Sequence, residues 1–323
     1  QRSRILNEDD LALMPELPPF LLYSLEVIGG ILLLFLGGDQ FVKGSVTIAT
    51  LCRIPQLVIG LTVVAFGTSA PELFVGVSSI LQNADDLAVG NVVGSNIFNI
   101  LVVLGCSALV FPLRVESRLV RRDVPVLLAI SSAAWGMASA GRMTWQAGVA
   151  LLIGLIINTV WEIRTSLEDH QETVETSNLQ RTGSGFSRSL TIALFQLAVG
   201  ITLLVVGSKT LVSGASSAAA FLKVPPAVIG LTIVATGTST PELITSVVAT
   251  LKGKTDLAVG NVVGSCLLNL LMVLGGCAAI SGGTGLQVSA ELISEDLPVM
   301  MIATLVCLPI FWTRSEERRV GKE

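Results

Sequence analysis

The sequence predicts an all-α polytopic membrane protein, and three observations lead to that fold class. Hydrophobic residues make up 51% of the 323 residues and charged residues only 14%, whereas ordinary soluble domains carry about 25% charged residues. Apolar runs of about 20 residues, the length of a membrane-crossing helix, recur along the chain. These runs are continuous and rich in Leu, Val, Ala and Gly, whereas the strands of membrane barrels alternate in polarity.

Nine apolar segments are predicted to cross the membrane, and the first can continue as an amphipathic helix to residue 50. They form a first half at 18–163 and a second half at 189–313, which are joined by a polar linker at 164–188. Polar tails flank the two halves at 1–17 and 314–323. In chain order the predicted spans are 18–38, 54–82, 87–111, 123–140, 145–163, 189–221, 226–251, 256–280 and 297–313.

Two parts of the sequence repeat each other. Residues 60–105 align without a gap with residues 230–275, and 28 of the 46 aligned positions are identical. The stretch DLAVGNVVGS occurs at both 86–95 and 256–265. Five predicted crossings separate equivalent points, and an odd number of crossings turns the second copy upside down. The sequence therefore predicts an inverted-topology repeat, with which many secondary transporters build a binding site near the membrane midplane.

Basic residues gather in alternate loops, which predicts the orientation of the chain. Because cytoplasmic loops carry an excess of Lys and Arg, we expect the linker and the C-terminus in the cytoplasm, the N-terminus outside, and the protein in the plasma (inner) membrane. The basic residues on the predicted cytoplasmic side are Arg114, Arg118, Arg121, Arg122, Arg164, Arg181, Arg188, Lys252, Lys254, Arg314, Arg318, Arg319 and Lys322.

The composition argues against enzyme and transition-metal chemistry. The chain has a single histidine, His170, and its five cysteines lack the spacing of a zinc site or a disulfide framework. No histidine or lysine lies near the serines of the repeats to act as a base. We therefore expect a protein that is not an enzyme, holds no prosthetic group and binds no nucleic acid. Its expected partners are the lipid bilayer and inorganic cations, and we expect a monomer.

The motif GTSAPE at 67–72, repeated as GTSTPE at 237–242, places a proline and a carboxylate inside an apolar segment. Proline lacks an amide hydrogen and its ring clashes with the preceding turn, so each helix must break or kink near the Gly-Thr pair. On a helix the Thr, Ser and Glu side chains of each motif share one face. They are Thr68, Ser69 and Glu72 in the first repeat, and Thr238, Ser239 and Glu242 in the second.

A polar stripe follows each motif on the next predicted helix. Its residues are spaced by four, so their side chains lie on one face of an otherwise apolar helix. The leading asparagines, Asn91 and Asn261, suit hydrogen bonds between helices and ion binding equally well. The stripes are Asn91, Ser95 and Asn99 in the first repeat, and Asn261, Ser265 and Asn269 in the second.

Two carboxylates within the membrane require a counter-charge. An ionised carboxylate at the bilayer centre costs about 2.5–3.5 kcal/mol on insertion scales, and the repeat segments contain no Lys or Arg that lies inside the bilayer. A bound cation can supply the charge. The donors are all oxygens, from carboxylates, amides, hydroxyls and the carbonyls freed at each break, which favours Ca²⁺, Mg²⁺, Na⁺ or K⁺ over transition metals, and Ca²⁺ over Mg²⁺.

Several residues outside these motifs have simpler interpretations. Asp39 and Lys43 have the i, i+4 spacing of an ion pair, and Glu26 and Glu162 near span ends are expected to snorkel or to lie at the interface. Cys266 is expected to pack in the core. Small residues are expected to allow close helix packing, and they are Gly90, Gly94, Gly260 and Gly264.

The paired motifs GTSAPE…GNVVGSNIFN and GTSTPE…GNVVGSCLLN closely resemble the two α-repeats of the calcium/cation antiporter superfamily, in particular of prokaryotic sodium/calcium exchangers. The resemblance implies a cluster of cation sites between the two repeats, with the long first and sixth helices sliding past them. It also implies ligands for Ca²⁺ and Na⁺. These are the carboxylates of Glu72 and Glu242, the side chains of Thr68, Ser69, Ser95, Asn99, Thr238, Ser239, Ser265 and Asn269, and the backbone carbonyls of Ala65 and Ala235.

The chain departs from the pattern of that superfamily in two respects. Relatives often carry an aspartate, associated with K⁺ co-transport, at the position of Asn269, so two carboxylates remain here and K⁺ dependence is not expected. The family usually has ten helices arranged as two five-helix halves. The counterpart of 145–163 is missing after 297–313, so about nine are expected and the second half lacks its last helix.

The function predicted from these features is secondary antiport that exchanges Na⁺ for Ca²⁺ across the plasma membrane by alternating access, with both ions competing for one midplane site. A Ca²⁺/H⁺ antiporter with the glutamates as proton carriers ranks second, because hydroxyls and carbonyls suit Na⁺ coordination better than proton transfer. A cation channel is a weaker alternative, since a duplicated chain with a broken helix in each half favours alternating access.

Overall fold

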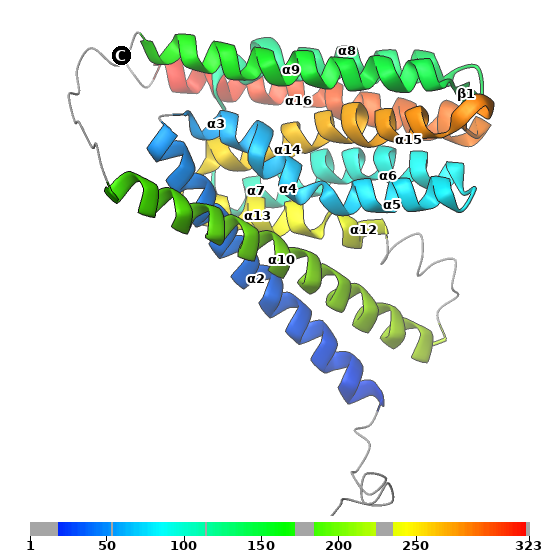
Figure 1. Ribbon diagram of the computed structural model, residues 1–323, viewed down its shortest axis with the longest axis horizontal. Coiled ribbons are helices and arrows are strands. Elements are labelled where there is room, and N and C mark those ends of the chain that lie inside the picture. The colour runs from blue at the N-terminus through cyan, green and yellow to red at the C-terminus, as the bar shows by residue number, and fades with distance from the viewer. Residues whose placement is uncertain (1–18, 53, 114, 172–183, 224–234, 321–323) are drawn as a thin grey trace, which may run out of the picture.

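The computed structural model describes residues 19–52, 54–113, 115–171, 184–223 and 235–320, and the architecture is almost wholly helical (Figure 1). Several helices contain short π-helical turns, labelled η, which have one extra residue per turn. The elements of the first half are α2 (Pro19–Cys52), α3 (Gln56–Ile59), η1 (Gly60–Val64), α4 (Ala65–Thr68), α5 (Ala70–Leu81), α6 (Asp85–Phe98), η2 (Asn99–Val103), α7 (Leu104–Val110), η3 (Leu119–Asp123), α8 (Val124–Ala138), β1 (Arg142–Met143) and α9 (Trp145–Gln171).

The described part of the second half repeats the helix break, between α12 and α13, and the π-helical turns that follow α14 and precede α16. The 3₁₀ turn η7 and strand β2 lie in its last connection. Its elements are α10 (Ser184–Phe221), α12 (Ala235–Thr238), α13 (Thr240–Leu251), α14 (Thr255–Leu268), η6 (Asn269–Leu274), α15 (Gly275–Ile280), η7 (Gly282–Thr284), β2 (Leu286–Gln287), η8 (Leu292–Asp296) and α16 (Leu297–Val320).

Six helices are long and apolar enough to cross a membrane, or seven when the bent pair Leu57–Thr68 and Ala70–Leu81 is counted as one span, within the part of the chain that the structure describes. Each of the nine predicted spans contains helix. The predicted span 123–140 corresponds to α8, whose 15 residues are preceded by the π-turn η3. The tail 1–17, residues 172–183 of the linker 164–188 and the start of 226–251 lie outside the described residues.

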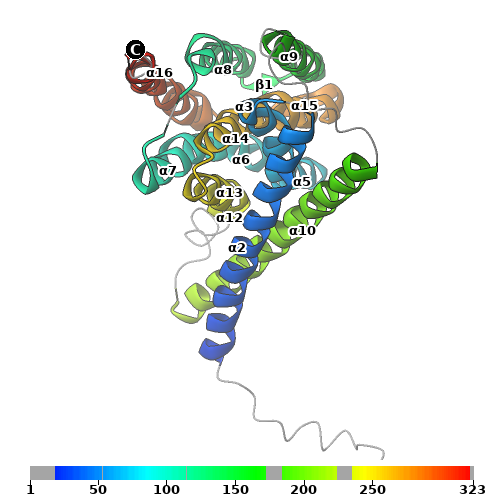
Figure 2. The same ribbon diagram turned by 90° about the vertical axis from the view of Figure 1, so that its left-hand side faces the viewer.

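Helices α2 and α10 form a long pair that extends beyond the bundle made by the other helices (Figure 1, Figure 2). Glycines spaced by seven residues line their contact and let the two backbones approach closely. A Cβ atom at Gly37 would lie 2.8 Å from the backbone nitrogen of Leu204, and one at Gly207 would lie 2.9 Å from that of Leu34. The seam consists of Gly30, Gly37 and Gly44 on α2 and Gly200, Gly207 and Gly214 on α10.

Helices α14 and α15 run through the middle of the bundle, and their most apolar stretch is wholly buried. Close packing against the first half depends on two glycines. A Cβ atom at Gly260 would lie 2.6 Å from the carbonyl oxygen of Leu57, and one at Gly264 would lie 2.6 Å from that of Leu61. The expected packing role is confirmed for these two. For Gly90 and Gly94, the segment related to Leu57 and Leu61 by the repeat lies outside the described residues.

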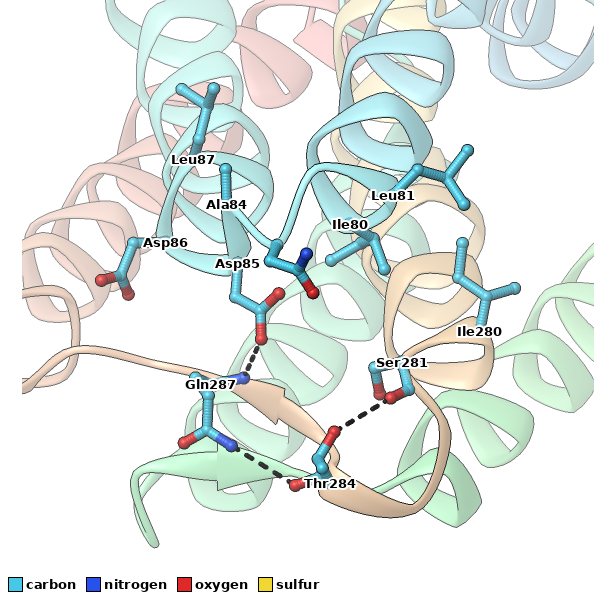
Figure 3. Close-up of a pocket in the computed structure, with 11 residues that line it drawn as sticks. Ile80, Leu81, Ala84, Asp85, Asp86, Leu87, Ile280, Ser281, Thr284 and Gln287 are labelled. Atoms are coloured by element: carbon cyan, nitrogen blue, oxygen red, sulfur yellow. Dashed lines mark hydrogen bonds between the residues drawn. The ribbon is translucent and has the colours of Figure 1, made fainter.

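A small clasp joins the two halves at the end of the bundle where α5 meets α6. Strand β1 pairs antiparallel with β2, with Arg142 opposite Gln287. The first residues of α6 hold this clasp, because Asp85 accepts a hydrogen bond from the amide of Gln287 at 2.9 Å (Figure 3), and Asp86 accepts one from the amide of Ser289 at 2.9 Å. Beside it lies an open cleft of 850 Å³, which Asp85, Asp86 and Gln287 help to line.

The charged residues outside the motifs are partly as predicted. Asp39 and Lys43 form the expected ion pair at 2.7 Å, and Lys252 contacts the same carboxylate at 2.6 Å. Glu162 lies near the end of its span, where a snorkelling or interfacial position was expected. Its side chain is buried because two arginines that precede α8, Arg118 and Arg122, reach it at 2.5 and 3.1 Å.

Candidate functional site

Both motifs break their helices at the serine. Helix α4 ends at Thr68, and Ser69 has φ −81° and ψ 5° before α5 begins. The helices on the two sides of this break are bent by 42°. In the second half Ser239 has φ −89° and ψ 7° between α12 and α13. The prolines that follow, Pro71 and Pro241, explain the breaks, because neither can donate the next helical hydrogen bond.

Hydrogen bonds link each glutamate to the serine of the motif in the opposite half. Ser69 donates to an oxygen of Glu242 at 3.3 Å, and Ser239 donates to an oxygen of Glu72 at 3.0 Å. All four side chains are fully buried. Each serine therefore donates a hydrogen bond to the carboxylate of the opposite repeat, so neither motif forms the site alone.

Each carboxylate keeps its second oxygen, Oε2, without a hydrogen-bond partner among the described residues. Within the same residues, neither Glu72 nor Glu242 forms an ion pair with Lys or Arg, and no cluster of three or more His, Cys, Asp or Glu side chains occurs. The centre of the protein thus holds two carboxylates that protein groups only partly satisfy. Buried charges are normally paired with opposite charge or bind metal ions.

The leading asparagines of the stripes, Asn91 and Asn261, form hydrogen bonds with the threonines and with the backbone of the motifs. Thr68 donates to Asn261 at 3.2 Å, and Thr238 donates to Asn91 at 3.4 Å. Each asparagine amide also donates to the backbone carbonyl of the glutamate in its own half, at 3.4 Å for Glu72 and 3.5 Å for Glu242. Of the two roles left open for Asn91 and Asn261, the structure shows the hydrogen bonds between helices.

Two of the remaining stripe residues contact the motif of the opposite repeat, and the other two are buried. Ser95 lies 3.0 Å from the hydroxyl of Ser239, and Ser265 lies 3.4 Å from the hydroxyl of Thr68. Asn99 and Asn269 are fully buried, and each begins a π-helical turn, a feature that often occurs at functional sites. Both amide atoms of Asn99 and the oxygen of Asn269 have no hydrogen-bond partner among the described residues.

Two backbone carbonyls near the breaks accept hydrogen bonds from protein groups. The Ala65 carbonyl accepts hydrogen bonds from the amide of Ser69 at 2.9 Å and from the hydroxyl of Thr68 at 3.4 Å. Ala235 is the first residue of α12. The Gly237 carbonyl, which Pro241 leaves without its helical donor, accepts a hydrogen bond from Ser208 of α10.

Three residues that support the site were not predicted as part of it. Ser208 ties α10 to the second break, Ser246 accepts a hydrogen bond from Asn261 at 2.9 Å, and Asn96 contacts Asn269 at 3.1 Å. A buried polar residue directly beside the stripe was the available signal for Asn96. Ser208 and Ser246 are single hydroxyls in apolar helices, and only the packing of the helices reveals their partners.

The donor set of this site suits hard cations. Its donors are two carboxylates, hydroxyls and amide oxygens, which is the ligand set of alkali and alkaline-earth ions. Hydrogen bonds bring the threonines, serines, glutamates and leading asparagines of both repeats together, contributed by α4, α5, α6, α12, α13 and α14. Asn99 and Asn269 lie buried at the first residues of η2 and η6.

Comparisons with known proteins match nearly the whole chain. A sequence model of the family described as sodium/calcium exchanger protein matches residues 23–164 and 192–320. The putative antiporter CaxA of Alkalimonas amylolytica is 35% identical over 94% of this chain and 93% of its own length. The inner membrane protein YrbG of Escherichia coli (strain K12) is 33% identical over 93% of each chain. The sodium/calcium exchanger MaX1 of Methanosarcina acetivorans is 31% identical over 90% of this chain and 91% of its own length.

Solved structures agree with the sequence comparisons. The fold is similar to that of the sodium-calcium exchanger NCX_Mj soaked with 10 mM Na⁺ and zero Ca²⁺, with a TM-score of 0.78 and 30% identity over 92% of each chain. A second structure of that exchanger, soaked with 2.5 mM Na⁺ and 0.1 mM Ca²⁺, matches with a TM-score of 0.75 over 89% of each chain. The membrane fold of the chain is therefore the fold of these structures.

Proposed function

The chain belongs to the sodium/calcium exchanger protein family, and on that premise we propose that it exports Ca²⁺ from the cell in exchange for inward-moving Na⁺. Both cations bind in turn at the cluster centred on Glu72 and Glu242. Membership of this family makes the chain a membrane cation exchanger and not an enzyme.

One observation carries the proposal. Two fully buried glutamates are joined by crossed hydrogen bonds from the opposite motifs, and each keeps one carboxylate oxygen without a partner among the described residues. One Ca²⁺ neutralises two carboxylates, and two Na⁺ do the same. The same oxygens therefore suit both ions, which compete for them.

Competition at a buried site explains the coupling of the two ion fluxes. An empty cluster leaves two carboxylates uncompensated inside the membrane, where ionised groups are costly. Reorientation of the cluster from one side to the other is therefore favourable only when cations occupy it. Export of Ca²⁺ can then be driven by the Na⁺ gradient without hydrolysis of a nucleotide.

The test is ⁴⁵Ca²⁺ uptake into proteoliposomes driven by an outward Na⁺ gradient, with Glu72→Gln and Glu242→Gln as the variants. Glutamine keeps the size of the side chain and removes the charge, so we expect each variant to lose Na⁺-dependent uptake and remain folded. Glu295→Gln, which removes an exposed carboxylate near α16, is the matched control and should exchange at the wild-type rate.

Separate gradients distinguish the possible coupling ions. Uptake that a pH gradient drives in sodium-free buffer would establish Ca²⁺/H⁺ antiport instead, and uptake that requires K⁺ would show that two carboxylates suffice for K⁺ coupling. Near-normal Na⁺-dependent exchange by either glutamine variant would disprove the assignment of the site.

A further inference from the structure

Asn96 connects the two halves directly beside the cation cluster. Its side chain is buried, and its amide nitrogen donates to the backbone carbonyl of Cys266 at 3.3 Å and lies 3.7 Å from the sulfur of Met300. Its amide oxygen accepts a hydrogen bond from the amide nitrogen of Asn269 at 3.1 Å. Asn96 is one helical position from the polar stripe, so it faces the partner helix α14 and not the two glutamates.

The direction of this chain of hydrogen bonds is fixed by its first acceptor. A backbone carbonyl can only accept, so the Asn96 atom that faces Cys266 must be the amide nitrogen. The Asn96 oxygen is then the atom available to Asn269, and Asn269 must turn its own nitrogen toward it. The oxygen of Asn269 is thereby left free, and it has no hydrogen-bond partner among the described residues.

The other half lacks this arrangement. The residue related to Asn96 by the repeat is Cys266, whose sulfur lies 3.9 Å from the backbone carbonyl of Asn96. The thiol also neighbours Asn99, yet neither amide atom of Asn99 forms a hydrogen bond among the described residues. A thiol is a weak donor and a weak acceptor, so it does not select one orientation of the Asn99 amide.

We propose that Asn96 is a positioning residue that holds Asn269 with its amide oxygen presented as a pre-oriented ligand for the transported cation. This inference rests on the cation site proposed above. Asn269 is then a fixed ligand, whereas Asn99 is a ligand that must be oriented when the ion binds. Fixing a ligand before binding removes part of the ordering cost that binding would otherwise include.

The decisive experiment exchanges the two related residues. Asn96→Cys removes the hydrogen bond to Asn269, and we expect it to raise the Ca²⁺ concentration for half-maximal binding about tenfold, the effect of losing about one net hydrogen bond. The double variant Asn96→Cys/Cys266→Asn keeps the composition. It places an amide at position 266 beside the backbone carbonyl of residue 96, where it can hold Asn99 in the same manner. We expect this variant to recover affinity to within about twofold of wild type.

Equilibrium binding of ⁴⁵Ca²⁺ and ²²Na⁺ to the purified chain is measured beside the thermal midpoint of unfolding and the maximal exchange rate. Recovery in the double variant would establish that an oriented amide, and not the packing of Asn96, supports affinity. Wild-type affinity in a folded Asn96→Cys variant, or a double variant as weak as the single one, would overturn the proposal.

The measurements also separate this inference from the proposed function. A wild-type chain that binds both cations without exchanging them would overturn Na⁺/Ca²⁺ exchange and leave the role of Asn96 to be decided by its variants. A wild-type chain that binds neither cation would overturn both proposals.

Discussion

Glu162 shows at the scale of one residue how packing determines the role of a charge near the end of a membrane helix. Its carboxylate is buried and contacts the guanidinium groups of both Arg118 and Arg122. Thr165 accepts a hydrogen bond from each arginine at 2.9 Å, and Arg122 lies 4.0 Å from the centre of the Trp161 ring. The Glu162 carboxylate thus contacts two positive charges between η3 and α9, and Asp123 lies 3.9 Å from one of them, Arg122.

Glu162→Gln is predicted to destabilise the protein by about 3 kcal/mol, because it leaves two poorly hydrated arginines without their main counter-charge. The measurement is chemical unfolding of the purified protein. Lys252→Gln is the control, since its pair with Asp39 is about one-third exposed and pairs of that kind contribute less than about 1 kcal/mol. Equal losses of unfolding free energy in the two variants would contradict the larger contribution assigned to the buried pair.

At the scale of the helix, the seam between α2 and α10 depends on glycine. The two backbones lie so close at Gly37 that an added Cβ atom would meet backbone as well as side-chain atoms of α10. Neither backbone can yield without moving the whole helix. The family resemblance implies that these two helices slide past the cation sites, and their close contact is suited to movement as one pair.

Gly37→Ala is predicted to destabilise the protein by about 1–3 kcal/mol, the typical cost of overpacking a close contact, and to reduce the exchange rate. Gly29→Ala, on the same helix, is the control. An added Cβ atom there meets nothing within 4 Å, so alanine should be neutral or slightly stabilising because of its helix propensity. The thermal midpoint of unfolding and the flux are measured for both variants. Equal values in the two variants would show that the contact between α2 and α10 does not depend on glycine at position 37.

The helical elements were largely predictable, because continuous apolar segments and two prolines determine them locally. The break was expected near Gly67 and Thr68 and lies at Ser69, within the same turn. The π-helical turns at Asn99 and Asn269 were not predictable, since an extra residue in a turn depends on contacts between helices and not on local propensity. The same reason applies to Asn96, whose partners belong to another helix.

At the scale of the whole molecule, the loops separate by charge between the two ends of the bundle. The connection between α5 and α6 lies at the same end as the β1–β2 clasp, where Asp85 and Asp86 meet Gln287 and Ser289. The short loop with Lys252 and Lys254 lies at the other end (Figure 1). The positive-inside rule predicts that this second end faces the cytoplasm.

Cysteine labelling is predicted to confirm that orientation. In a background with Cys52 and Cys106 replaced by Ser, Thr284→Cys should react with a membrane-impermeant maleimide in intact cells, whereas Lys254→Cys should react only after permeabilisation. Both positions lie in short connections between helices, so the two variants can be compared directly. The reverse pattern would place the N-terminus in the cytoplasm.

The candidate site was predictable as far as the sequence repeats itself. Glu72 and Glu242, with their neighbouring serines and threonines, stand out because the same constellation occurs twice. The hydrogen bond from Ser69 to Glu242 in the opposite half could not be predicted from either copy of the motif, because it depends on how the two halves pack. The shared motif therefore predicts the ligands, and their partners follow only from the three-dimensional arrangement.

The contact between Ser208 and the carbonyl of Gly237 has a consequence for the direction of transport. The residue related to Ser208 by the repeat is Gly38, which has no hydroxyl to donate. Two identical halves would give an exchanger that behaves alike on both faces of the membrane. Here one half carries an additional hydrogen bond between its long helix and its break, so the two halves are not equivalent. If the chain exchanges Na⁺ for Ca²⁺ as proposed, we expect exchange in one direction to be faster than in the other under equal ion gradients of opposite sign, and flux measured in both directions tests this.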